Sequence, residues 1–202
     1  EAVIETVDGV QRIRGLAGSG KTIVLALKVA YLHAQNQSWK IAVTFHTRAL
    51  KEQFKRLINN FTIEQLGSEP DWDSIDIFNS WGAPGDKEND GMYHRYCVEN
   101  SIDYYDFQTA KNEFGGDDAF KNVCKLALEQ SSSNKIEKYD LILIDEAQDF
   151  PPEFIKLCYK FLTEPKRLVY AYDELQSLNG LSVLPPEQLF GKDSKGVPLV
   201  TL

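Results

Sequence analysis

The chain has 202 residues, enough for one domain with an insertion, and its formal net charge is −8. This acidic balance argues against a nonspecific coat for nucleic acid, although it leaves room for a local basic track. No apolar run is long enough to span a bilayer, and no signal peptide is visible.

The cysteines predict the redox compartment of the protein, and the first residue predicts whether the chain is a piece of a longer one. Cys97, Cys124 and Cys158 are far apart and form no CxxC pair. This spacing predicts free thiols in a reducing compartment, and we expect a cytoplasmic protein. Because the sequence begins at Glu1 without a methionine, we also expect it to be an excised piece of a longer chain.

A strand predicted over 10–14 leads into the glycine-rich stretch GLAGSGKT, which matches the pattern G-x-x-x-x-G-K-[ST]. Glycines let successive N–H groups curl around a phosphate, and the positive end of the following helix faces the same anion. Lys21 is predicted to reach the β- and γ-phosphates, and the Thr22 hydroxyl to bind Mg²⁺. A chance glycine turn before a buried helix is the alternative, but the order strand, loop, helix favours the phosphate site. The predicted nucleotide-binding residues are Gly15, Ala17, Gly18, Ser19, Gly20, Lys21 and Thr22.

The run IAVTF, at 41–45, predicts a second strand that is buried on both faces. Apolar residues then recur at helical spacing from Leu50 to Phe61, and Thr47 is expected to cap that helix. Residues 40–56 carry a local charge of +4, so Thr47 and Arg48 are predicted to hold a nucleic-acid phosphate at the helix start. An ordinary solvated helix face explains the charges of Lys55 and Arg56 better.

The run SIDIF, at 74–78, alternates polar and apolar residues and predicts a strand nearer the edge of the sheet. Trp81 follows in a loop and is a candidate for stacking on a base, as are Phe45 and Tyr172, although Phe45 fits a core position equally well. Residues 84–134 read as a helical insertion with a charge of −5. We therefore expect a core in two parts, 1–83 and 135–202, around that insertion.

The stretch LILIDEAQDF places a carboxylate at the end of a buried strand. Asp145 is predicted to hold Mg²⁺ through water, and Glu146 to orient and deprotonate the attacking water. A helix is expected after Pro151 and Pro152, and another buried strand over 168–172. Strands that alternate with helices predict a parallel α/β sheet covered on both sides.

The motifs GLAGSGKT, VTFHTRAL, LILIDEAQDF and YAYDELQS occur in this order and together resemble the motor core of superfamily 1 helicases of the UvrD/Rep type. The Gln of DEAQDF is the most specific feature, since DEAD- and DEAH-type proteins lack it. The resemblance covers nearly the whole chain outside the insertion. It implies a first RecA-like domain with a small helical insertion (1B-like), and 3′ to 5′ translocation on DNA driven by ATP hydrolysis with Mg²⁺.

The resemblance also implies roles for single residues. Gln148 and Gln176 would sense the γ-phosphate and couple it to the nucleic acid. The segment with Thr47 and Arg48 would grip single-stranded DNA, and so would the segment with Asn79 and Trp81. Asn79 stands where the family often has His, and Tyr172 stands where it commonly has Gly.

The family resemblance further implies a second RecA-like domain that supplies catalytic arginines, so we expect this chain to bind ATP and Mg²⁺ but to hydrolyse ATP poorly and not to unwind DNA alone. Three alternatives stay open at this point. One is another P-loop class, such as a signalling ATPase or a nucleotide kinase; one is an ATP-switched binding or regulatory module without motor activity; and one is RNA in place of DNA.

Overall fold

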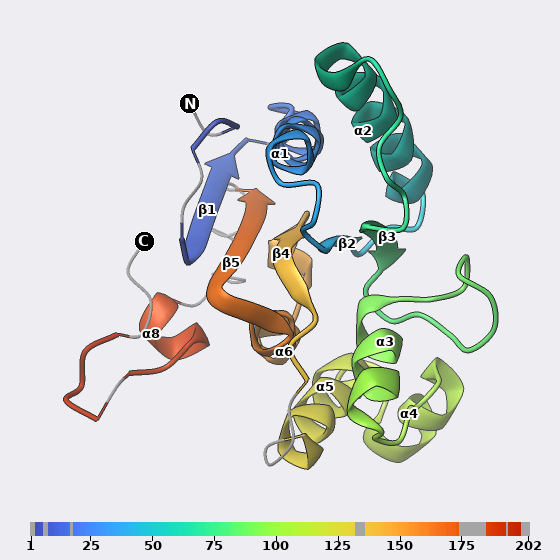
Figure 1. Cartoon of the computed structure of the whole chain (residues 1–202). Helices are drawn as coiled ribbons and strands as arrows, with labels where there is room; N and C mark the ends of the chain where they lie inside the picture. The colour runs from blue at the N-terminus through green and yellow to red at the C-terminus, as the bar shows by residue number, and fades with distance from the viewer. Residues whose placement is uncertain are drawn as a thin grey trace.

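The computed structural model describes residues 3–5, 8–16, 18–131, 136–173, 185–192 and 194–198. Five strands form one sheet in the order β1-β5-β4-β2-β3, and every pair of neighbours is parallel (Figure 1). The predicted α/β fold is therefore confirmed, and β3 lies at an edge as its alternating pattern indicated. The strands are β1 (Val10–Gly15), β2 (Ile41–Phe45), β3 (Ile75–Asn79), β4 (Tyr139–Ile144) and β5 (Leu162–Asp173).

Helices connect these strands at most of the predicted places. Helix α6 starts at Pro152, where a residue without an N–H loses no helical hydrogen bond. Helix α2 starts at Leu50, and Ala49 rather than Thr47 is its N-terminal capping residue, so the predicted Thr47 cap is wrong. The helical elements are α1 (Lys21–Gln35), α2 (Leu50–Leu66), α3 (Met92–Asn100), α4 (Phe107–Phe114), α5 (Ala119–Gln130), η1 (Ala147–Asp149), α6 (Pro152–Lys160) and α8 (Pro186–Leu189).

The sheet separates two apolar cores, because successive side chains of a strand point to opposite faces. On β4, Leu141 and Leu143 lie with the buried residues of α1 and α2. Ile142 and Ile144 lie in the other core, with apolar residues of α3, α5 and α6. Covering helices on both faces explain why β4 contains four consecutive apolar residues.

Three helices, α3, α4 and α5, occupy the chain between β3 and β4, where the helical insertion was expected (Figure 1). Tyr93, Tyr96 and Val123 from this region are buried in the same core as Ile142. These helices therefore help to cover one face of the sheet. The division of the chain at 84 and 134 stays a prediction from sequence.

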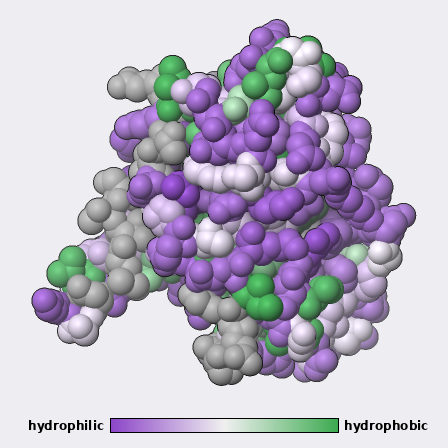
Figure 2. Space-filling model, viewed as in Figure 1, coloured by the Kyte–Doolittle hydropathy of each residue, from purple (hydrophilic) through white to green (hydrophobic). Residues whose placement is uncertain are grey.

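The outer surface is mostly hydrophilic in the view of Figure 2, where hydrophobic residues form only small, separate patches. Among the described residues, no helix has the length and apolar character that crossing a membrane requires. The three cysteines are free thiols and all are buried.

Candidate nucleotide-binding site

A cavity of about 350 Å³ lies at the carboxyl ends of the strands, where ligands bind in parallel α/β sheets. The glycine loop and the end of β4, which are far apart in sequence, both line it. Lys21 and Asp145 therefore share one cavity, as their motifs predicted. The lining residues are Gly18, Ser19, Gly20, Lys21, Thr22, Ile23, Gln53, Asp145, Glu146, Gln148 and Asp173.

The loop between β1 and α1 has a backbone that only glycine adopts easily at two of its positions. Gly18 and Gly20 have φ angles of 73° and 80°, in the left-handed region. A Cβ atom on Gly15 would lie 2.6 Å from Ser19 Oγ, so the Ser19 side chain would have to shift to admit one. Lys21 Nζ donates to the carbonyl oxygens of Gly15 at 3.1 Å and Leu16 at 2.7 Å. The lysine ammonium is thus held inside the curled loop.

A direct hydrogen bond joins the two motifs. The Thr22 hydroxyl donates to Asp145 Oδ2 at 2.6 Å across 123 residues of sequence. The Glu146 N–H donates to the other carboxylate oxygen, Oδ1, at 2.9 Å. The two motifs follow β1 and β4, and β5 lies between these strands in the sheet. The first turn of α1 brings Thr22 across that gap to the end of β4.

Burial is the main influence on the two acidic side chains of this site. It raises the pKa of Asp145, while the hydrogen bonds from Thr22 and Glu146 and the charge of Lys21 oppose the rise. Burial also raises the pKa of Glu146, and the negative charges of Asp145 and Asp149 add to that effect. Burial and mutual repulsion destabilise the ionised forms of these two adjacent carboxyl groups, and a bound cation would offset that cost.

The oxygen groups of the site fit Mg²⁺, which prefers hard oxygen ligands. The Thr22 hydroxyl and the Asp145 carboxylate already lie within hydrogen-bond distance of each other. The cavity volume is within the usual range for a ligand pocket, and the loop supplies backbone N–H groups and one lysine. These residues can therefore hold a triphosphate together with its metal ion.

Three residues that we did not single out from the sequence, Ile23, Gln53 and Asp173, also line the cavity. Asp173 is the last residue of β5, a position similar to that of Asp145 directly after β4. The Asp173 residue is only 4% exposed. Its N–H donates to Gln148 Oε1 at 3.0 Å, which ties the predicted γ-phosphate sensor to β5. The shared pattern of a buried strand followed by Asp could have identified it. Gln53, from α2, carries no such signal.

The predicted sites at Ala17 and Gln176 lie outside the described residues. The other predicted nucleotide and metal residues, apart from Gly15 at the start of the loop, all border the cavity described above. Their contacts with a nucleotide stay predictions.

The residues predicted to contact nucleic acid lie at or just after the carboxyl ends of β2 and β3, which is the same edge of the sheet as the cavity. Thr47 is exposed, and its hydroxyl lies 3.3 Å from Glu146 Oε2. Arg48 and Asn79 line a small hollow of about 100 Å³ beside it. The Asn79 side chain also accepts the N–H of Gly82 at 2.9 Å, so this residue shapes the turn after β3.

The aromatic candidates for base stacking have other roles in the structure. Phe45 is fully buried, which agrees with the core position that was its alternative, and Tyr172 is 7% exposed, so neither ring offers a stacking surface in this structure. Trp81 is half-buried, stacks on Phe120 with 5.0 Å between ring centroids, and donates its indole N–H to Tyr105 O at 2.9 Å. The structure favours packing over base stacking for Trp81, because its ring face is already covered.

The chain matches a known protein family. A family model described as an AAA domain matches residues 1–181. This domain occurs in UvrD/Rep-like helicases and in related P-loop NTPases. No curated protein matches the chain.

Proposed function

The chain belongs to the AAA domain family, and from that premise we propose that it is the ATP-binding motor domain of a superfamily 1 helicase or translocase. Its substrate would be ATP with Mg²⁺, and its track a single strand of DNA, with RNA as the alternative. The observation that carries the proposal is the 2.6 Å hydrogen bond between Thr22 and Asp145, beside a lysine enclosed by a glycine loop.

Each residue of the cavity has a chemical task in this proposal. Lys21 would bind the β- and γ-phosphates, while Thr22 and Asp145 would hold the metal ion, Asp145 through water. Bound Mg²⁺ would neutralise the charge that develops on the phosphate oxygens. Glu146, whose pKa burial raises, is suited to take a proton from an attacking water.

A contact between the cavity and the proposed track supports motor activity over simple nucleotide binding. The Thr47 hydroxyl lies 3.3 Å from Glu146, so the proposed catalytic base touches the segment proposed to grip the strand. A change at the γ-phosphate that moves Glu146 would therefore act on Thr47. Gln148 accepts the N–H of Asp173 at the end of β5, and this hydrogen bond joins two residues of the cavity lining.

The cavity also supports the need for a second RecA-like domain. Among the described residues that line it, Lys21 is the one cationic side chain and there is no arginine. Charge-stabilising arginines supply several powers of ten in rate in phosphoryl transfer. We therefore propose that this domain binds ATP and Mg²⁺ by itself but hydrolyses ATP slowly.

The phosphate assignment is tested by Lys21→Ala. Loss of the enclosed ammonium should weaken binding of a fluorescent ATP analogue by at least about tenfold, measured by anisotropy with Mg²⁺ present. Lys125→Ala on α5 is the matched control, since this exposed lysine lies outside the cavity. Unchanged affinity in a folded Lys21→Ala protein would refute the assignment.

The motor assignment is tested by the effect of nucleic acid on hydrolysis. Oligo(dT) or oligo(U) should stimulate ATP turnover by this chain joined to a second RecA-like domain, and Glu146→Gln should abolish turnover while ATP still binds. A protein that merely switches on ATP binding would keep its function in Glu146→Gln. Turnover that neither oligonucleotide alters would argue against a motor.

A further inference from the structure

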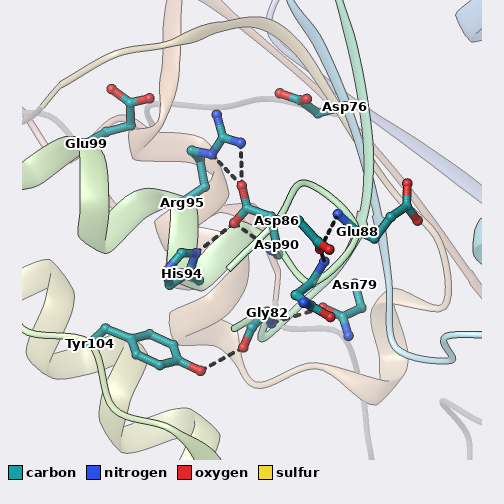
Figure 3. A network of polar contacts seen from close by, with 12 residues as sticks. Asp76, Asn79, Gly82, Asp86, Glu88, Asp90, His94, Arg95, Glu99 and Tyr104 are labelled. Atoms are coloured by element: carbon teal, nitrogen blue, oxygen red, sulfur yellow. Dashed lines mark hydrogen bonds and ion pairs between the residues drawn. The ribbon is translucent and has the colours of Figure 1, made fainter. Parts of the chain in front are cut away.

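The loop formed by residues 83–90 joins β3 to α3 and closes on itself at a narrow neck. Ala83 N–H donates to Asn89 O at 2.7 Å, and the backbones of Gly82 and Gly91 touch so closely that a Cβ on Gly82 would lie 2.2 Å from Gly91 N. Tyr104 OH donates to Gly82 O at 2.7 Å (Figure 3). The neck is therefore a defined structure, and the 83–90 loop projects from it as a unit.

Polar contacts at Asp86 and Asp90 hold the second half of the 83–90 loop, which contains Glu88, in place. Asp90 is buried and lies between His94, at 2.8 Å from Nδ1, and Arg95, whose Nε donates to it at 2.6 Å (Figure 3). Asp86 Oδ1 accepts the N–H of Glu88 at 3.1 Å, which holds the backbone of Glu88. The Glu88 side chain points away from Asp90 in Figure 3 and is free to meet another element.

That element is α2, whose lysines both pair with Glu88. Lys51 Nζ lies 2.8 Å from Glu88 Oε2 and also donates to the Glu88 carbonyl oxygen at 3.1 Å. Lys55 Nζ lies 3.3 Å from Oε1. These hydrogen bonds and the lysine charges hold the pKa of Glu88 below its usual value. One carboxylate thus occupies two of the basic residues in the positively charged stretch 40–56.

The position of this ion pair indicates that the Glu88 carboxylate occupies a place where a phosphate could bind. Glu88 and Lys51 line the same hollow as Arg48 and Asn79, two of the residues proposed to contact nucleic acid. A carboxylate held by two lysines resembles a phosphate of a nucleic-acid backbone in charge and in hydrogen-bond acceptors. We propose that Lys51 and Lys55 form a further phosphate-binding site for single-stranded nucleic acid and that Glu88 blocks it from within the chain.

This inference rests on the proposed function, and it adds an autoinhibitory contact to it. Ion pairs at the protein surface stabilise a fold only weakly, and the Glu88 side chain is 65% exposed, while Lys55 is 37% and Lys51 16% exposed. A polyanion that brings several phosphates, and releases counterions when it binds, can displace such a weak contact. The loop would leave α2 when a strand binds and return to it when the strand dissociates.

The test measures binding of fluorescent oligo(dT) of about 20 nucleotides by anisotropy at constant salt. Glu88→Gln should bind roughly three- to tenfold more tightly than the native chain, because both lysines are released from a negative charge. Glu113→Gln, on the exposed face of α4, changes the net charge equally and should leave affinity unchanged. Adding Lys51→Ala and Lys55→Ala to Glu88→Gln should remove the gain.

The outcomes separate this inference from the proposed function. If the native chain binds oligo(dT) and Glu88→Gln binds no more tightly than Glu113→Gln, the blocking role of Glu88 is refuted while the proposed function stands. If neither the native chain nor Glu88→Gln binds oligo(dT) or oligo(U), both are refuted. Equal thermal unfolding temperatures for all variants show that altered folding is not the cause of any difference.

Discussion

Two neighbouring carboxyl groups, Asp145 and Glu146, dominate the cavity at the scale of single residues. Asp145 accepts hydrogen bonds from Thr22 and from the Glu146 N–H, so both of its oxygens have donors. Glu146 has a φ angle of 54°, in the left-handed region where side chains are disfavoured. A strained residue with a raised pKa beside a second carboxyl group lowers stability, which is common where a protein keeps residues for chemistry.

Glu146→Gln should therefore stabilise the fold at neutral pH. Burial and nearby negative charge raise the pKa of Glu146 in the folded chain. The free energy of unfolding of the native chain therefore falls as the pH rises from about 4.3, the usual pKa of Glu, to the raised pKa. The free energy of unfolding in urea should be higher for Glu146→Gln at pH 7 and equal to the native value near pH 3.5, where the carboxyl group is protonated in both states. Glu64→Gln, at an exposed position of α2, is the control. An equal gain at both pH values would contradict the electrostatic cause.

At the scale of elements, the turn between β3 and α3 depends on two glycines that no side chain could replace. Gly82 and Gly91 approach each other where the chain enters and leaves the 83–90 loop, and Gly82 has a φ angle of 78°. A parallel β-bridge pairs Gly91 with Asn79, the last residue of β3. The close approach fixes the direction of α3 relative to the sheet.

Gly82→Ala should destabilise the protein more than a change that alters backbone conformation alone. Its new Cβ would meet Gly91 N at 2.2 Å in addition to the strain of a left-handed φ, so we expect a loss of about 3 kcal/mol or more in the free energy of unfolding. Gly67→Ala, at the end of α2, has a φ angle of 73° and nothing within 4 Å, and should cost about 1 kcal/mol. If both variants lost a similar free energy of unfolding in urea, the backbone at Gly82 and Gly91 would be shown to relax around the new Cβ.

At the scale of the whole molecule, the cavity lies where the first and second halves of the chain meet. The glycine loop and α1 come from one end of the chain, and β4 and β5 come from the other, with α3, α4 and α5 between them in sequence. A ligand that contacts both parts should stabilise the complete fold, since unfolding would separate its binding groups.

ATP with Mg²⁺ should therefore raise the unfolding temperature. Ligand at 100 times its Kd adds about 2.7 kcal/mol, which corresponds to a shift of about 5–10 °C for a domain of this size. Removal of the metal with EDTA should abolish most of the shift, because Thr22 and Asp145 are proposed to act through Mg²⁺. Lys21→Ala should show little shift with or without metal. A shift that EDTA leaves intact would place the nucleotide elsewhere.

The sequence by itself determined the local features of this protein. The apolar runs predicted β2, β4 and the end of β5, and the motif GLAGSGKT predicted the turn from β1 into α1, because backbone sterics and side-chain periodicity depend on nearby residues. Asp145 and Glu146 could be predicted for the same reason, since a buried strand that ends in an acidic pair has a defined position in a parallel sheet.

Only the tertiary structure decided how those features meet. It placed β5 between β1 and β4, set Thr47 against Glu146, and paired Lys51 with Glu88 from 37 residues away. It also buried Phe45 and Tyr172 and packed Trp81 on Phe120. Strand order, long-range ion pairs and the exposure of an aromatic ring depend on how whole elements pack, and a pattern in neighbouring residues does not contain that information.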